Sequence, residues 1–222
     1  MAETVAFFRP DDERAAEAAE IVAELGAEPL SDPMLAVEPT GAAPREDAAV
    51  TVLTSKTGAE LVSEVGWEPA GEVVAIGSAT AGALTEAGYR VDRVAGRRVE
   101  IARSDHGSTV LTDGLADAGA YVHETVLYRL VRPEGAGEAA EAAAEQTLDG
   151  ACFTSSLTVE HLLEAAADRG VREAAVAGLD DAVVGAIGEP TREATETHGI
   201  AVDVVPDTAD FEALAAAVVE RL

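Results

Sequence analysis

Cysteine, aromatic residues and long apolar runs are scarce in this chain of 222 residues. The scarcity of cysteine and of long apolar runs excludes internal disulfide bonds and membrane-spanning segments. The single cysteine, Cys152, cannot form an internal disulfide bond. No apolar run is long enough to cross a bilayer, and no signal peptide precedes the first apolar segment, so we expect a soluble cytoplasmic protein. The histidines lack the spacing of metal ligands, and we interpret them as surface or structurally satisfied side chains: His106, His123, His161 and His198.

Basic residues are also few, with 15 Lys and Arg against 42 Asp and Glu, which gives a formal net charge of −27. Nucleic acid is excluded as a partner because no basic stripe exists to displace counterions. Acidic residues stand singly among alanines, as in residues 138–143, which favours an acidic folded surface over a disordered tail. Such a surface suits a salt-rich cytoplasm, where the Debye length falls to about 3 Å at 1 M. We predict a halophilic protein; binding of a partner is the alternative explanation of the acidic surface.

Short apolar runs alternate with longer alanine-rich segments, a pattern typical of parallel β-sheets covered by helices. Residues 5–9 are predicted to form a strand. A helix follows, opened by Pro10, Asp11 and Asp12 and ended by Gly26, and residues 27–30 begin the next strand. The fold class is therefore α/β.

This pattern of strands, turns and helices occurs twice along the chain. Arg9 and Pro39 recur as Arg103 and Pro133, both 94 positions later. The Thr-Ser turn of residues 52–57 recurs at 152–157 (offset 100), and the Ile-Gly turn of residues 75–80 recurs at 186–191 (offset 111). A growing offset predicts loop insertions after a duplication. Two similar halves with polar turns at their strand ends predict a ligand cleft lined from both sides.

The copies differ at one place. Residues 202–205 are followed by an amphipathic helix at 211–221, whereas only residues 95–98 separate the run 89–94 from the next strand. Parallel neighbours need a connection of roughly a dozen residues or more. The alternatives are a hairpin or a lost crossover helix, and we favour the loss.

Taken in order, these motifs resemble uroporphyrinogen-III synthase. The resemblance covers the Arg9-Pro10 start, the 153–156 and 186–191 turns, the Tyr128-Arg129 stretch and the closing segment 202–206 with its helix. It implies two flavodoxin-like parallel-sheet domains joined by a two-stranded connector; the short 94–99 connection predicts, apart from the resemblance, that one of them lacks a crossover helix. The first domain would comprise residues 1–33 and 134–222, the second residues 40–127, and the connector strands residues 34–39 and 128–133.

The resemblance also implies a reaction. The linear tetrapyrrole hydroxymethylbilane, which carries eight carboxylates, would bind between the domains and close to uroporphyrinogen III with inversion of the last ring and loss of water. No metal or organic cofactor is implied, and we expect a monomer. A spirocyclic pyrrolenine is the expected intermediate.

Because the protein is acidic, local donors must bind these carboxylates, and backbone N–H groups at helix N-termini are suited to this. Tyr128 is the catalytic candidate, as a proton donor to the departing hydroxyl; packing on the connector is its alternative. The alternative role of the turn residues is helix capping, and the alternative for Lys56 is a surface position. The two arginines could instead form ion pairs, Arg9 with Asp11 and Arg103 with Asp105. The predicted substrate-binding residues are Arg9, Thr54, Ser55, Lys56, Gly77, Ser78, Thr80, Arg103, Thr154, Ser155, Ser156, Gly188 and Thr191.

Two other functions remain open on sequence grounds. One is a non-enzymatic ligand-binding or regulatory protein with two such lobes, since this fold hosts many functions. The other is an inactive synthase remnant, suggested by the short 94–99 connection. A dinucleotide-binding fold is disfavoured because no Gly-x-Gly-x-x-Gly turn is present.

Overall fold

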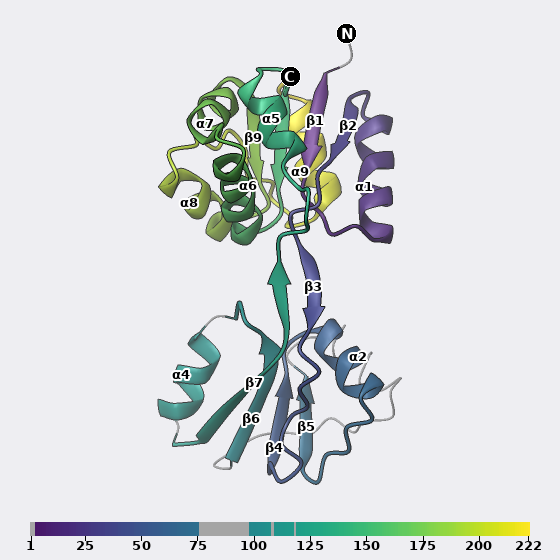
Figure 1. Cartoon of the computed structure of the whole chain (residues 1–222), viewed down its shortest axis with the longest axis vertical. Coiled ribbons are helices and arrows are strands. Elements are labelled where there is room, and N and C mark those ends of the chain that lie inside the picture. Colours follow the sequence, from purple (N-terminus) through teal and green to yellow (C-terminus); the bar gives the residue numbers. More distant parts are fainter. Residues whose placement is uncertain (1–2, 76–97, 108, 118) are drawn as a thin grey trace. The chain divides into compact units, whose positions relative to one another are not determined.

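The computed structural model describes residues 3–75, 98–107, 109–117 and 119–222. Its chain divides into two compact units (Figure 1). Unit 1 comprises Met1–Ala36 and Val131–Leu222, and unit 2 comprises Val37–Leu130. Among the described helices, none is both long and apolar enough to span a membrane.

Unit 1 is a parallel sheet in the order β2-β1-β8-β9, and a bridge between Gly185 and Val204 continues it beyond β9. Helices cover both faces (Figure 1). Its elements are β1 (Thr4–Phe7), α1 (Glu13–Glu24), β2 (Glu28–Ser31), α5 (Glu138–Ala144), β8 (Gly150–Phe153), α6 (Ser156–Asp168), α7 (Arg172–Asp181), β9 (Val183–Ala186), α8 (Glu189–Thr197) and α9 (Phe211–Val219).

Alternation along each short strand divides the core of unit 1 into two clusters. Val5 and Phe7 of β1 face α1 and α9, whereas Ala6 faces α5, α6 and α7. Asp12 starts α1 by accepting a hydrogen bond from the Arg14 N–H at 2.9 Å. The predicted strand, helix and strand over residues 5–30 are therefore present, with slightly different bounds.

Unit 2 has the sheet order β3-β7-β6-β4-β5, in which β7, β6, β4 and β5 are parallel. The helix α2 packs on one face through Ala59 and Val62, and α4 packs on the other through Leu111 and Leu115. The elements are β3 (Ala36–Pro39), β4 (Val50–Leu53), α2 (Lys56–Glu64), β5 (Glu72–Ala75), β6 (Arg98–Ser104), α4 (Val110–Asp117) and β7 (Tyr121–Val131).

The two sheets are copies of one arrangement. In unit 1 the order β2-β1-β8-β9 corresponds to β7-β6-β4-β5 in unit 2. The pairing register repeats as well, since Val5 pairs with Gly150 and Val99 with Val50, positions related by the offsets 94 and 100. Val183 pairs with Gly150 as Glu72 pairs with Val50, which is the offset of 111. The α/β fold class and the duplication are confirmed.

The prediction of loop insertions was wrong, because the extra residues of unit 1 form helices. Between the Thr-Ser turn and the following strand, unit 2 has only α2 whereas unit 1 has both α6 and α7. Before that turn, unit 1 has α5 where unit 2 has no regular element between β3 and β4. Each added helix buries alanine-rich surface against the sheet, so the insertions enlarge the core of unit 1.

Part of the sequence interpretation concerns residues 76–97, which lie outside the described ranges. Three features belong to it: the short connection before Val99, the run 89–94, and the first Ile-Gly turn with Gly77, Ser78 and Thr80. The expected loss of a crossover helix stays a prediction.

Candidate functional site

Unit 2 contains a cavity of about 320 Å³ at the carboxyl edge of its parallel strands. This is the edge at which open α/β sheets bind their ligands. Its lining comes from the turn after β4, from the end of β6 with the loop that follows, from β7 and from α4. Four predicted site residues meet here, namely Thr54, Ser55, Arg103 and Tyr128, together with Ser104, His106, Gly107 and Leu111.

Ser55 links the start of α2 to Tyr128. Its Oγ accepts the Gly58 N–H at 2.9 Å and so caps the helix. The same oxygen accepts the Tyr128 hydroxyl at 3.0 Å. Tyr128 is 6% exposed and packs in the cluster beneath α2, so its ring is fixed while its hydroxyl lies at the cavity. Ser55 therefore caps α2 and also lines the cavity.

A β-bulge in β7 brings Tyr128 to this position. In unit 1 each residue of β1 pairs with the residue of β2 that lies twenty-four positions later, beginning with Thr4 opposite Glu28. In unit 2 the spacing between paired residues of β6 and β7 starts one smaller, with Arg98 opposite Tyr121. The register then shifts between Arg103 and Ser104, so that Ser104 pairs with Tyr128, again twenty-four positions later. Because one residue is bulged, Leu127 and Tyr128 both pack beneath α2, against the usual alternation.

Arg103 is the buried cation of the cavity, at 8% exposure. Its Nε and Nη2 lie 2.7 and 2.6 Å from Oε2 of Glu124 on β7. Gly107 lies flat against the guanidinium, since a Cβ there would be 2.4 Å from Nη1. The ion pair and this backbone contact hold the guanidinium in the cavity wall, and Glu124 is a partner that the sequence did not suggest.

The remaining described residues of this predicted set in unit 2 are Thr54 and Lys56. Thr54 lines the cavity directly before the helix cap. Lys56 begins α2, is 64% exposed and lies 3.4 Å from Glu60 one turn later, and it is not among the residues that line the cavity. A surface ion pair of this kind contributes roughly 0.3–0.5 kcal/mol.

In unit 1 the predicted residues occupy the corresponding carboxyl edge of the sheet, and most have structural partners. Ser155 caps α6 through the Thr158 N–H at 3.3 Å, directly after Thr154, and the Ser156 hydroxyl donates to the Pro190 carbonyl at 3.1 Å. Gly188 precedes α8, whose Thr191 side chain is 4% exposed. The Arg9 guanidinium lies 4.7 Å from the centre of the Phe211 ring, and its burial lowers the pKa of Arg9. Their roles in binding stay predictions.

The position of unit 1 that corresponds to Tyr128 holds Met34, which is fully buried. Its carbonyl oxygen lies 2.6 Å from Nδ1 of His161 on α6. Unit 1 therefore has a packed thioether where unit 2 has a hydroxyl at a cavity, and the two copies are not chemically equivalent.

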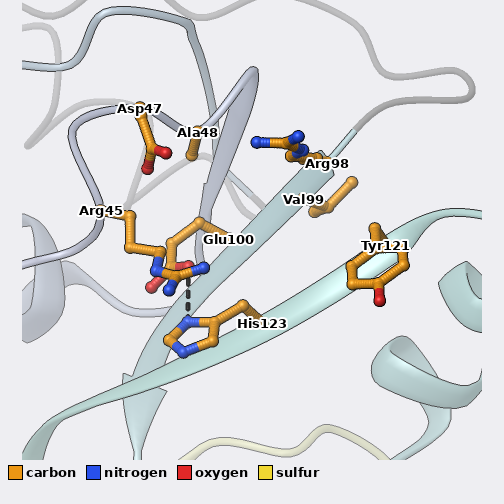
Figure 2. A pocket seen from close by; sticks show the side chains of 8 residues that line it. All are labelled: Arg45, Asp47, Ala48, Arg98, Val99, Glu100, Tyr121 and His123. Carbon is orange, nitrogen blue, oxygen red and sulfur yellow. Dashed lines mark hydrogen bonds and ion pairs between the residues drawn. The ribbon is translucent and has the colours of Figure 1, made fainter.

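A second, smaller cavity of about 40 Å³ lies at the amino edge of the same sheet in unit 2. Figure 2 shows Glu100 and His123 pointing toward one another from β6 and β7, with Arg45 reaching the same place from the loop before β4. The buried Glu100 carboxylate contacts His123 Nδ1 at 2.8 Å and accepts a hydrogen bond from Thr125. This cavity is small and lies opposite the usual ligand edge, so the larger one is the candidate site.

Sequence reasoning missed His106, which lines the larger cavity two positions after Ser104. No periodic or spacing signal marks a single histidine in a loop; only its position at the end of the repeated strand 99–103 was visible. In the part of the chain that the structure describes, no group of three His, Cys, Asp or Glu side chains is placed to hold a metal ion.

Two parallel sheets with helices on their faces, one with a polar cavity at its carboxyl edge, define a duplicated α/β protein of the flavodoxin-like class. Solved structures share this fold. A crystal structure of uroporphyrinogen III synthase from Thermus thermophilus, a methionine variant, superimposes with a TM-score of 0.68 at 21% identity over 96% of both chains. The uroporphyrinogen-III synthetase of Helicobacter pylori gives a TM-score of 0.69 at 13% identity over 100% of both chains.

Sequence comparison identifies the family. The family model of uroporphyrinogen-III synthase HemD matches residues 16–97 and 93–216. A putative uroporphyrinogen-III synthase from Methanothermobacter thermautotrophicus is 30% identical over 230 residues, covering 88% of this chain and 90% of the relative. The chain belongs to the uroporphyrinogen-III synthase family, the hydro-lyases that form uroporphyrinogen III in tetrapyrrole biosynthesis. The resemblance drawn from the motifs is confirmed.

Proposed function

We propose that this protein acts as a cytoplasmic monomer that closes hydroxymethylbilane to uroporphyrinogen III, with inversion of the last pyrrole ring and loss of water. Family membership supports the substrate. The observation that carries the proposal is the cavity in unit 2 where the Tyr128 hydroxyl, the capped start of α2 and the Arg103 guanidinium meet.

Binding of an octacarboxylate by a chain of net charge −27 needs local donors. Arg103 supplies a fixed guanidinium in the cavity wall, and Thr54 adds a hydroxyl beside the first turn of α2. Backbone N–H groups at a helix N-terminus favour anions through their aligned dipoles. These groups are hydrogen-bond donors on an acidic protein, and a substrate carboxylate is the anion that they would hold.

Tyr128 is the proposed acid for loss of water. Its phenolic proton passes to the hydroxymethyl oxygen as the C–O bond breaks, the pyrrole nitrogen lone pair supplies the electrons, and water leaves. Ser55 can then turn its own proton toward the phenolate while its oxygen still accepts the Gly58 N–H, because a hydroxyl donates once and accepts twice.

Conformational control is the other part of the proposed catalysis. Unbound bilane closes without inversion, so the protein must hold the last ring in the geometry that leads through the spirocyclic pyrrolenine. Such positioning lowers the activation barrier, because the entropy of ordering the substrate is lost on binding and not in the chemical step. We therefore expect the loss of one side chain to slow the reaction without abolishing it.

The test is an isomer assay. Purified protein is incubated with hydroxymethylbilane, the products are oxidised, and the uroporphyrin I and III isomers are separated by chromatography. The protein should give the III isomer, and formation of the I isomer alone would identify a non-enzymatic binding protein or an inactive remnant. Tyr128→Phe should slow formation of the III isomer by roughly 10²-fold, the low end for a general acid.

Tyr121→Phe is the matched control for this variant. Tyr121 lies on the same strand at the opposite end of the sheet and is 83% exposed. Its loss should leave the rate of III-isomer formation unchanged. Equal rates for Tyr128→Phe and the control would remove Tyr128 from the chemistry.

A further inference from the structure

His106 lines the same cavity as Tyr128 and Arg103, and its side chain is about half exposed. It stands in the loop that directly follows β6, between Asp105 and Gly107. Its neighbour Gly107 is the residue that lies flat against the Arg103 guanidinium. The imidazole is therefore placed beside the buried cation of the proposed substrate site.

Asp105 orients this imidazole and ties it to β7. The Asp105 N–H donates to the Tyr128 carbonyl at 3.2 Å, and Oδ1 accepts the Leu130 N–H at 3.1 Å. The same Oδ1 lies 2.9 Å from His106 Nδ1. One carboxylate therefore fixes the histidine ring to the strand segment that carries Tyr128.

Asp105 sets the orientation and the donor pattern of the ring. A carboxylate as acceptor places one ring proton on Nδ1, and only the doubly protonated ring carries a second N–H, at Nε2. Among the residues that the structure describes, Nε2 of His106 makes no hydrogen bond, so its N–H in the imidazolium form is available as a donor. Desolvation opposes ionisation of Asp105, but hydrogen bonds from His106 and the Leu130 N–H outweigh it and lower the pKa of Asp105.

The surrounding groups show what Nε2 can meet. Arg103 on β6 and Asp105 in the loop are the charged groups next to His106 along the chain. The phenol of Tyr128 lines the same cavity from β7, and α4 contributes the apolar Leu111. Glu124 is already paired with Arg103. An anion that enters the cavity would thus meet a guanidinium and, when His106 carries both ring protons, an imidazolium.

We propose that His106, held by Asp105, is a substrate-binding residue whose Nε2–H donates to a carboxylate of the tetrapyrrole beside Arg103. The proposal rests on the proposed function and adds a specific contact to it. Asp105 acts as a positioning residue, because it contacts the ring and the strand but lines no part of the cavity. Because the Nε2–H exists only in the imidazolium form, affinity for the polyanion should fall as pH rises, while kcat changes little.

The experiment measures KM and kcat for bilane closure between about pH 5.5 and pH 8.5. His106→Gln keeps an uncharged donor near Nε2 and should raise KM about tenfold at the acidic end, as expected for loss of a charge-assisted hydrogen bond. It should also flatten the pH dependence of KM and leave kcat within about twofold. Asp105→Asn still accepts the Leu130 N–H but places no charge beside the ring, so its KM should exceed that of the wild type at the acidic end.

His198→Gln is the matched control, because His198 caps α8 in unit 1. It should keep the wild-type profile. Binding of uroporphyrin III, which retains eight carboxylates, gives a readout independent of turnover. Its affinity should show the same pH dependence in the wild type and in His198→Gln, but not in His106→Gln. A wild type that makes the III isomer, together with a His106→Gln variant of unchanged KM profile, would overturn this proposal alone. Formation of only the I isomer by the wild type would overturn the proposed function.

Discussion

The hydrogen bond between Tyr128 and Ser55 can be measured as a coupling energy. Ser55→Ala removes the cap of α2, which costs about 1 kcal/mol. It also removes the acceptor of the hydroxyl of Tyr128, a residue that is only 6% exposed. A buried unsatisfied group costs about 1–3 kcal/mol, and the lower end applies because the hydroxyl borders a cavity that water can enter. The variant should therefore lose about 2 kcal/mol of unfolding free energy.

Tyr128→Phe removes the same hydrogen bond from the other side and should cost about 1 kcal/mol, since the serine still caps the helix. In the double variant no hydroxyl is left without a hydrogen-bond partner, so the loss of unfolding free energy should be about 1.5 kcal/mol. The two substitutions then couple by about 1.5 kcal/mol, as contacting residues do.

Trp67 makes this measurement specific to unit 2. It is the single tryptophan of the chain, is 4% exposed and packs in the same cluster as Tyr128. Urea unfolding followed by its fluorescence gives the free energies of the four proteins. Ser155→Ala, which removes the matching cap in unit 1, should be additive with Tyr128→Phe. Additivity of Ser55→Ala with Tyr128→Phe would refute the hydrogen bond and its place in the site.

Three further predictions concern packing, the thiol and salt. Gly178→Ala should destabilise unit 1 by about 3 kcal/mol or more in urea unfolding, because a Cβ there would lie 1.8 Å from the Ala143 carbonyl oxygen; a neutral result would place α7 further from α5. Burial raises the pKa of Cys152 to about 12, so a thiol reagent at pH 8 should label the unfolded chain but not the native one. The melting temperature should rise between about 0.1 and 2 M KCl as the net charge of −27 is screened, and an unchanged value would contradict halophilic adaptation.

Strand pairing was the part of the fold that the sequence revealed best. Repeated motifs at offsets of 94, 100 and 111 reappear as equivalent registers in the two sheets, with Val5 opposite Gly150 and Val99 opposite Val50. Short apolar strands that end in polar turns are local signals, and duplication made each of them visible twice. Thr54, Ser55 and Arg103 could be identified for the same reason, since each ends or follows a repeated strand.

The added helix α7 was hidden by its composition. It packs through Ala175, Gly178 and Leu179, of which only the last is strongly apolar, and Gly178 lets the backbone of α5 approach closely. A helix that packs through such small residues shows only weak hydrophobic periodicity in its sequence, although its packing is tight. His106 was missed for a related reason, because its partner Asp105 and the cavity wall come together only in the folded chain.

The bulge in β7 shows how the site survives a change in chain length. Unit 2 is one residue shorter than unit 1 between Arg98 and Tyr121, compared with Thr4 and Glu28. Without compensation Leu127 would pair with Ser104, and because side chains alternate along a strand, Tyr128 would point to the face away from α2. The shift at Ser104 restores the register at the one point where the phenol must reach Ser55. The irregularity that breaks the sequence pattern is thus the feature that builds the candidate site.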